Sequence, residues 1–207
     1  MIEIIDCEQN SPEWLAARCG VVTASRFKDV LAKGEGKTRS KYLYELTAEI
    51  LRGYPEEDGY SNAHMERGHV QEDEARQLYA FIKDCEPQRV GFVKAGRIGC
   101  SPDSLIGDEG GLEIKTALGH IQAERLLRRV LPSEHKAQVQ GSLWVTGRQW
   151  WDFVSYSPGL DPLILRIERD EEYIAQLAKA VDAFNEELDA IVASIRTHQD
   201  FRRQAAA

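Results

Sequence analysis

The chain has 207 residues, 43% of them hydrophobic, and a formal net charge of −8 at pH 7. This length and apolar content suit a single domain with a packed core, and they exclude a disordered chain. The acidic balance excludes a protein that binds nucleic acid by overall charge alone, and no apolar run approaches the ~18 residues of a membrane span.

The first part of the chain is predicted to be helical. Ser11 followed by Pro12 is typical of a helix start, and Thr23 or Ser25 is a plausible cap for the next helix. Four helices are expected here, at 11–18, 26–31, 41–51 and about 62–82.

Short β-rich segments follow, interrupted by one helix. Around Lys94-Ala95-Gly96 the chain reads as a hairpin, and DEGG is a second turn before the strand LEIK. The later elements are a helix over 133–146 closed by Gly147, the strands WWDFVSYS and PLILRIER, and a long amphipathic helix over about 171–195.

This order of elements predicts an α/β fold, with a small mixed β-sheet flanked by helices. We expect one domain over 1–207, in which about 1–10 and 198–207 are peripheral tails.

The strand LEIK places an acid and a lysine together. The two-residue period of a strand points Glu113 and Lys115 to one face and Leu112 and Ile114 to the other. We expect the apolar pair to be buried and the charged pair to share an open face. A solvated strand face carrying a Glu–Lys pair would explain the pattern about as well as a reactive site.

A second acid precedes this strand. Asp103 follows Pro102, which cannot donate to a β-ladder, so Asp103 should lie where a strand breaks. The DEGG turn would bring Asp103 beside Glu113, and two carboxylates repel unless a cation lies between them. Mg²⁺ and Mn²⁺ prefer such oxygen ligands, and a neighbouring lysine can orient a water molecule.

The helix before the hairpin could contribute a third acid. Glu72 lies on the same predicted stripe as Ala75, Tyr79 and Ile82. A carboxylate beside an apolar face is costly to desolvate unless it is paired or bound to metal. An acidic first turn that complements the helix dipole is the alternative explanation.

Taken together, GCSPDSLI…GGLEIK and AQVQGSLWVTG resemble the phage lambda exonuclease family, also called the YqaJ-type viral recombinase family. That family belongs to the PD-(D/E)XK nuclease superfamily, whose fold the resemblance implies. WLAARCGVVTAS, RGHVQEDEAR and IERDEEYI resemble further family segments, so the resemblance covers all but about ten residues at each end.

The resemblance implies a metal site. Asp103, Glu113 and the backbone carbonyl of Ile114 would bind one or two Mg²⁺ ions, or Mn²⁺ in their place. Lys115 would position or activate the attacking water, and Glu72 would be the helical acid near the metals.

The resemblance also implies contacts with the DNA end. Arg18, Ser25 and Ser101 match family positions that bind the 5′-phosphate. A further phosphate-binding arginine of the family has no counterpart here, because that position is Ile121; Arg125 lies one helical turn later and is an additional candidate.

Two glutamines on one predicted helix complete the set. Gln140, one turn before Trp144, would support the lysine or the DNA backbone, and Gln138 is a further candidate for DNA contact. Without the resemblance, such a pair is more simply a helix surface that meets the core.

The implied activity is metal-dependent 5′→3′ digestion of one strand of linear double-stranded DNA, preferably 5′-phosphorylated. The product would carry 3′ single-stranded tails for phage-type homologous recombination by strand annealing. The family implies a homotrimeric ring and a single-strand annealing protein as partner. Scattered cysteines and an N-terminus without signal-peptide features favour the cytoplasm, that of a bacterial host for a phage enzyme.

Two alternatives remain at this stage. The chain could be another PD-(D/E)XK DNA nuclease, either a restriction-type endonuclease or a RecB-like repair nuclease. It could also be a non-catalytic protein that binds DNA ends.

Overall fold

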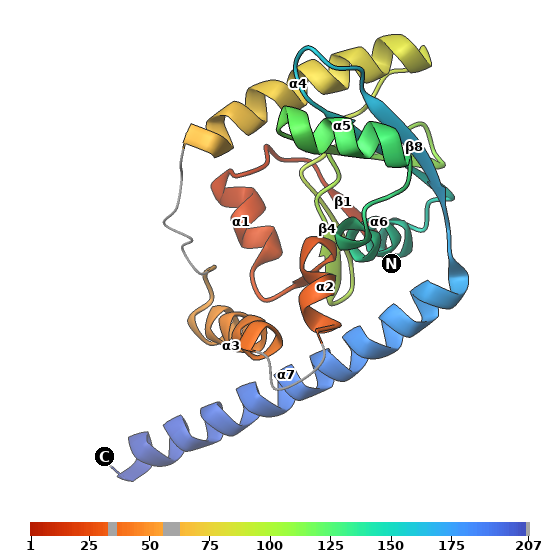
Figure 1. The fold of residues 1–207 in the computed structure, drawn as a ribbon. Helices are drawn as coiled ribbons and strands as arrows, with labels where there is room; N and C mark the ends of the chain where they lie inside the picture. Colours follow the sequence, from red (N-terminus) through yellow and green to blue (C-terminus); the bar gives the residue numbers. More distant parts are fainter. Residues whose placement is uncertain (33–36, 56–62, 206–207) are drawn as a thin grey trace.

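The computed structural model describes residues 1–32, 37–55 and 63–205, and within these it describes the side chains of 1–32, 37–55 and 70–198. The helices are α1 (Pro12–Arg18), α2 (Phe27–Val30), α3 (Lys37–Arg52), α4 (Ala63–Lys83), α5 (Gly119–Arg128), α6 (Ser133–Thr146) and α7 (Glu171–Ala205), with a 3-10 turn η1 (Ala24–Arg26) before α2 (Figure 1). The strands are β1 (Ile2–Ile5), β2 (Val22–Thr23), β3 (Phe92–Ala95), β4 (Ile98–Cys100), β5 (Ser104–Ile106), β6 (Gly110–Thr116), β7 (Trp150–Tyr156) and β8 (Leu163–Glu168).

The strands form two mixed sheets of four strands each. One sheet has the order β1-β3-β4-β2 and the other the order β5-β6-β7-β8. In the second sheet β6 pairs parallel with β7 over its whole length and antiparallel with β5. The predicted α/β class is confirmed, but the expected single sheet is divided where the chain passes from β4 to β5 through Ser101, Pro102 and Asp103.

Most predicted elements are present, and their local signals act as expected. Ser11 caps α1 by accepting a hydrogen bond from the Trp14 N–H at 3.2 Å. Gly147 ends α6 with a φ of 69°, a conformation that favours glycine. Two elements were not predicted, the edge strand β1 and the helix α5, and α7 continues past the expected end to Ala205.

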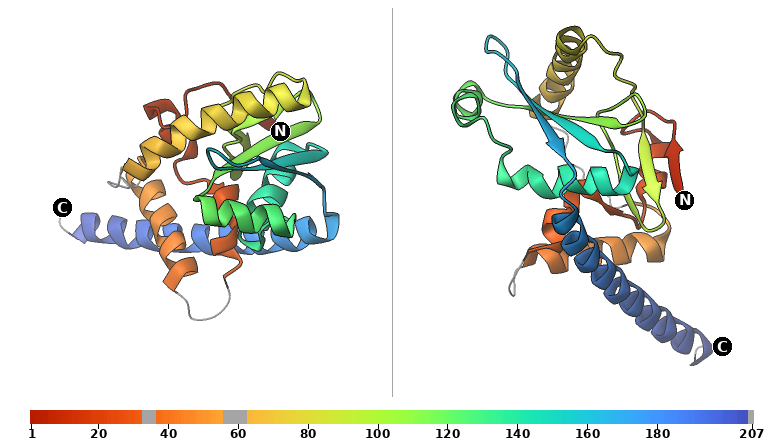
Figure 2. Two further views of the ribbon diagram at one scale, coloured as in Figure 1. Left: turned by 45° about the horizontal axis from the view of Figure 1, so that its top comes forward. Right: turned by 90° about the vertical axis from the view of Figure 1, so that its right-hand side faces the viewer.

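The second sheet lies between two helices. On one face, Ala75 and Tyr79 of α4 pack against Leu112, Ile114 and Val154 of the sheet. On the other face, α6 contributes Val139 and Leu143, which pack with residues of β5, β7 and α7. β6 is therefore covered on both sides, and Figure 2 shows this layered arrangement from two further directions.

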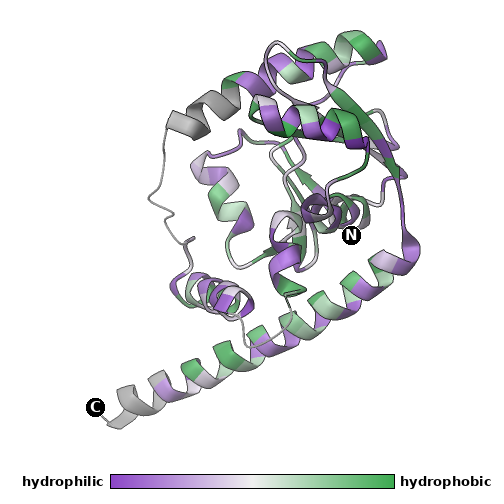
Figure 3. Cartoon of the chain, viewed as in Figure 1, coloured by the Kyte–Doolittle hydropathy of each residue, from purple (hydrophilic) through white to green (hydrophobic). Residues whose placement is uncertain are grey.

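The long helix α7 supports the other part of the core. Its apolar residues Leu177, Val181, Phe184 and Leu188 are buried against α2, α3 and α6. Apolar and polar stretches alternate along α7 (Figure 3), as expected of a helix with one buried stripe. Within the described residues, no helix combines the length and apolarity needed to cross a bilayer.

The predicted stripe of α4 is correct only in part. Ala75 and Tyr79 are both 1% exposed, but Ile82 is 47% exposed and does not share their face. The reason is angular, because ten residues of a 3.6-residue helix rotate Ile82 about 80° away from Glu72.

A close contact of α6 gives a stability test. A Cβ added at Gly141 would lie 2.4 Å from Cδ2 of Phe27. Gly141→Ala should therefore lower the free energy of unfolding by about 1–3 kcal/mol through overpacking, despite the better helix propensity of alanine. Urea unfolding measures this change.

Gly119 in α5 is the matched control. Nothing lies within 4 Å of a Cβ added there, so Gly119→Ala should be neutral or stabilising. Equal unfolding midpoints for the two variants would contradict the packing described here.

Candidate active site

Asp103 lies where the chain leaves β4 and enters β5. Its backbone N–H donates to the Leu112 carbonyl at 3.2 Å, and its Oδ2 accepts the N–H of Ile114 at 2.5 Å. These two bonds tie the residue after Pro102 to the middle of β6. The predicted strand break therefore places the Asp103 carboxylate next to the acid-bearing segment of β6.

Glu113 and Lys115 share one face of β6, as the strand period predicts. Lys115 Nζ lies 2.5 Å from Glu113 Oε1, and Gln138 Nε2 donates to the same oxygen at 2.6 Å. The expectation that this face is open was wrong, since α6 covers it and Glu113 is only 2% exposed. Glu113 Oε2 is buried and has no hydrogen-bond partner.

The charges at this point influence one another strongly. Burial raises the pKa of Asp103 well above its usual value, and the negative charges of Glu113 and Glu72 raise it further. Burial alone would lower the pKa of Lys115, but the carboxylates of Glu113, Asp103 and Glu72 outweigh it and raise that pKa overall. Lys115 is therefore an ammonium group at neutral pH, and the two acids repel each other.

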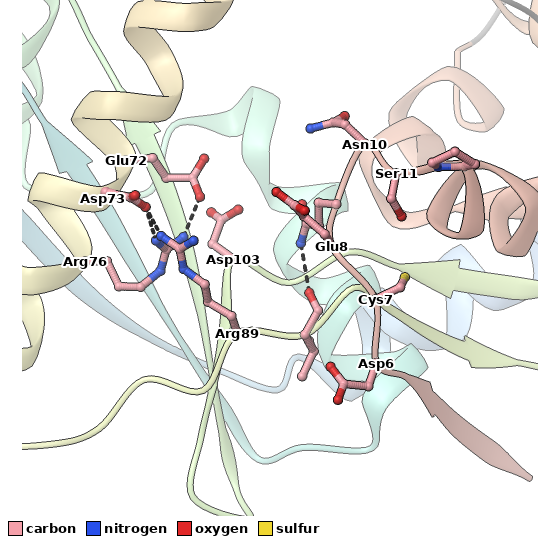
Figure 4. A pocket seen from close by; sticks show the side chains of 13 residues that line it. Asp6, Cys7, Glu8, Asn10, Ser11, Glu72, Asp73, Arg76, Arg89 and Asp103 are labelled. Carbon is pink, nitrogen blue, oxygen red and sulfur yellow. Dashed lines mark hydrogen bonds and ion pairs between the residues drawn. The ribbon is translucent and has the colours of Figure 1, made fainter.

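Glu72 faces the same region from α4. It lines a cavity of about 900 Å³ together with Asp103, Asp73 and Arg76, and residues 6–12 form the opposite wall (Figure 4). Arg76 Nη2 lies 2.5 Å from Glu72 Oε1. Glu72 is thus paired with an arginine on its own helix.

Arg18, Ser25 and Ser101 are brought together, although they are far apart in the sequence. All three line a second cavity of about 260 Å³, which Gln138 and Trp14 also line. Because Gln138 bonds Glu113 as well, this cavity lies directly beside the acidic site.

The hydrogen bonds of Ser101 determine what its hydroxyl can do. Its Oγ accepts from Trp14 Nε1 at 2.9 Å and from Arg18 Nη1 at 3.0 Å. Both lone pairs of the oxygen are used, so the hydroxyl proton remains to donate to a ligand. The Arg18 guanidinium also lies 4.0 Å from the centre of the Trp14 ring. The cavity therefore presents fixed donors to an anion.

The structure corrects the expectation for Gln140. Its Nε2 donates to the Glu168 carbonyl at 2.9 Å, and its Oε1 accepts the N–H of Asp170 at 2.9 Å. Both ends of its amide therefore hold the link between β8 and α7, and Gln138 makes the contact with the acidic site. Two residues along a helix turn the side chain by about 200°, so only one of the two glutamines can face β6.

Arg125 lies on the other side of Lys115 and does not line the 260 Å³ cavity. Its Nη1 donates to Ser155 Oγ at 3.0 Å, and its Nη2 lies 3.3 Å from His135 Nε2. The structure does not bring Arg125 together with Arg18, Ser25 and Ser101.

The donor set at Asp103 and Glu113 suits a divalent cation. Within the described residues, no three side chains of His, Cys, Asp or Glu are grouped closely enough to hold a metal ion. Two carboxylates are nevertheless enough for Mg²⁺, which usually keeps several waters. The unpartnered Oε2 of Glu113 and its repulsion with Asp103 are the observations that fit a cation.

Comparison with known proteins now identifies the family. The model of the YqaJ-like viral recombinase domain matches residues 13–149, about two thirds of the chain. The chain belongs to this family. The match includes every candidate residue from Arg18 to Gln140.

Solved structures agree with this assignment. LHK-Exo, an alkaline exonuclease from Laribacter hongkongensis, is 36% identical, with a TM-score of 0.83 over 92% of this chain and 98% of that one. LHK-Exo in complex with dAMP has a TM-score of 0.84 over the same shares. A phage-related exonuclease from Haemophilus somnus 129PT, 15% identical with a TM-score of 0.63 over 84% of this chain and 96% of that one, shares the fold. The predicted PD-(D/E)XK nuclease fold is confirmed.

A curated relative covers a shorter part of the chain. The uncharacterized protein ExoD of Escherichia coli (strain K12) is 39% identical over 70 residues, which are 31% of this chain and 78% of that protein.

Sequence analysis missed several residues of the site. Trp14 and Arg76 were not considered, although an arginine three and four residues after acids on one helix is a recognisable pairing pattern. Nothing local in the sequence marks His135 or Ser104, whose neighbours come from distant segments.

The two glutamines should behave differently when truncated. Gln140→Ala removes the partner of two backbone groups from a side chain that is 2% exposed, so it should lower the free energy of unfolding by about 1–3 kcal/mol. Gln138→Ala, at a half-buried position, should cost clearly less in the same urea titration. The reverse order would show that the assignments of the glutamines are exchanged.

His135 should make stability sensitive to pH. Burial, with the nearby charge of Lys115, lowers the pKa of His135 from 6.5 to about 4. Between these values the unfolded chain binds a proton that the folded chain does not, so stability falls as the pH drops through this window. The loss should be about 1–3 kcal/mol.

His135→Gln is the comparison. Urea unfolding at several pH values should give a shallower acid loss for this variant, while both proteins respond alike above pH 6.5. Parallel losses between pH 6.5 and 4 would remove His135 as their cause.

Proposed function

We propose that this protein is a metal-dependent 5′→3′ exonuclease that degrades one strand of linear double-stranded DNA and leaves a 3′ single-stranded tail. The observation that carries the proposal is the junction of two sites through one residue. Gln138 lines the cavity of Arg18, Ser25 and Ser101, and it also donates to Glu113 in the acidic site. The family and the alkaline exonuclease relatives support a nuclease.

Asp103, Glu113 and the backbone carbonyl of Ile114 would hold one or two Mg²⁺ ions, with Mn²⁺ as a substitute. When bound, such an ion stabilises the negative charge that develops on a phosphodiester and lowers the pKa of water. Glu72 would contribute negative charge from α4, since it raises the pKa of both Asp103 and Lys115.

Lys115 would orient the attacking water and stabilise negative charge at the scissile phosphate. Its pKa is raised in the free protein, so it supplies a positive charge there rather than acting as a base. The ion pair with Glu113 and the strand on both sides of β6 fix the position of its ammonium group. Electrostatic groups that are held in place before the reaction account for much of enzymatic rate enhancement.

The 260 Å³ cavity would bind the 5′-phosphate of the DNA end. Arg18 provides a guanidinium, which suits phosphate oxygens, and Ser101 provides a hydroxyl donor. Ser25 lines the same wall. A pocket of this kind would position the first phosphodiester of the strand at Asp103 and Glu113, and it favours an exonuclease over a restriction-type endonuclease or a RecB-like repair nuclease.

Two partners complete the proposal. The acidic net charge of −8 gives little general attraction for DNA. A homotrimeric ring around the duplex would retain the substrate by enclosure, and a single-strand annealing protein would bind the exposed 3′ tail.

Lys115→Ala tests the proposed chemistry. With linear duplex that carries one 5′-phosphate and one 5′-hydroxyl end, the native protein should digest the phosphorylated strand in Mg²⁺. Lys115→Ala should lower the rate of nucleotide release by about 10²–10³-fold without lowering the thermal midpoint.

Arg18→Gln and a closed circle are the controls for the end. Arg18→Gln should remove most of the preference for the phosphorylated end, and closed circular duplex should resist the native protein. Digestion of circles, or full activity of Lys115→Ala, would refute the proposal.

A further inference from the structure

We propose that Arg76 is a positioning residue that holds Glu72 toward the cation site formed by Asp103 and Glu113. This inference rests on the proposed metal-dependent function and adds a residue to it. Arg76 comes from α4 and does not belong to the D…ExK pattern. It also lines the 900 Å³ cavity with Glu72 and Asp103 (Figure 4).

The contacts of Arg76 use every side of its guanidinium. Nη2 lies 2.5 Å from Glu72 Oε1, Nη1 lies 2.6 Å from Asp73 Oδ1, and Nε donates to Ser104 Oγ at 3.1 Å. Ser104 Oγ in turn donates to the Asp103 carbonyl at 2.5 Å. Arg76 therefore connects the acid of α4 to the backbone of the residue that begins the D…ExK pattern.

Burial makes this connection rigid. Arg76 is 8% exposed and Ser104 is fully buried, whereas the side chain of Glu72 is 30% exposed. A buried guanidinium must keep its partners, because an unpaired charge there is strongly destabilising. Arg76 thus fixes the more exposed Glu72, not the reverse.

The geometry leaves one oxygen of Glu72 for another partner. Oε1 accepts from Arg76, and a carboxylate has a second oxygen with its own lone pairs. The charge of Glu72 acts on both Asp103 and Lys115. A free glutamate side chain samples several rotamers, and pairing with Arg76 restricts Glu72 to the side of the cavity where Asp103 lies.

Mn²⁺ binding to the full-length protein without DNA tests the proposal, measured by calorimetric titration. Arg76→Lys keeps the charge but cannot make the three-way contact of a guanidinium, so it should weaken Mn²⁺ binding by about tenfold. Arg76→Gln, which buries no charge, is a second variant with the same expectation. Thermal melting reports whether each variant is folded.

A double variant separates positioning from a general structural role. If Arg76 acts through Glu72, then Arg76→Lys combined with Glu72→Gln should bind Mn²⁺ no more weakly than Glu72→Gln alone. The matched control is Arg128→Lys, because Arg128 pairs with Glu124 at 2.9 Å with the same spacing of four residues, but on an exposed surface. Its Mn²⁺ affinity should be unchanged.

The outcomes distinguish this inference from the proposed function. Unchanged Mn²⁺ affinity in Arg76→Lys and Arg76→Gln, or a further tenfold loss in the double variant, would overturn the role of Arg76. In either case a loss of nuclease activity in Lys115→Ala would leave the function intact. A native protein that neither binds Mn²⁺ nor degrades DNA would overturn both.

Discussion

A single buried carboxylate sets the requirements for the whole site. Glu113 is 2% exposed, and both of its donors, Lys115 and Gln138, contact the same oxygen. A buried charge with an unsatisfied oxygen costs several kcal/mol unless something positive reaches it. The crossing between the sheets brings Asp103, another acid, to the same place. The arrangement is electrostatically incomplete in the protein alone, which is what a cation-dependent enzyme requires.

Helix α6 joins the separate parts of the site. Ser142 and Gln138, one turn apart, both line the cavity that holds Arg18. His135 lies one turn further along, where the charge of Lys115 affects it. The opposite side of α6 carries Gln140, which fixes the start of α7. One helix therefore aligns the pocket, the acid and the lysine, and its packing transmits the position of α7 to all three.

What could be predicted from the sequence was local. The strand period gave the shared face of Glu113 and Lys115, and Pro102 marked the break that positions Asp103. The cover over Glu113 could not be predicted, because it is set by the docking of a helix that is distant in the sequence. The choice between Gln138 and Gln140 failed for the same reason. β1 was missed because four residues, Ile2–Ile5, form a strand only through their pairing with β3.

The pairing of β6 has a consequence for how this protein can fail. Antiparallel β5 and parallel β7 hold β6 from both sides, and β7 does so over Gly110–Thr116. A slip by one residue would turn Leu112 and Ile114 toward α6 and push Glu113 into the apolar layer beneath α4. Such a chain would lose its core and its chemistry in one event. A folded but misaligned enzyme, able to hold DNA without cutting it, is therefore excluded by the same hydrogen bonds that build the sheet.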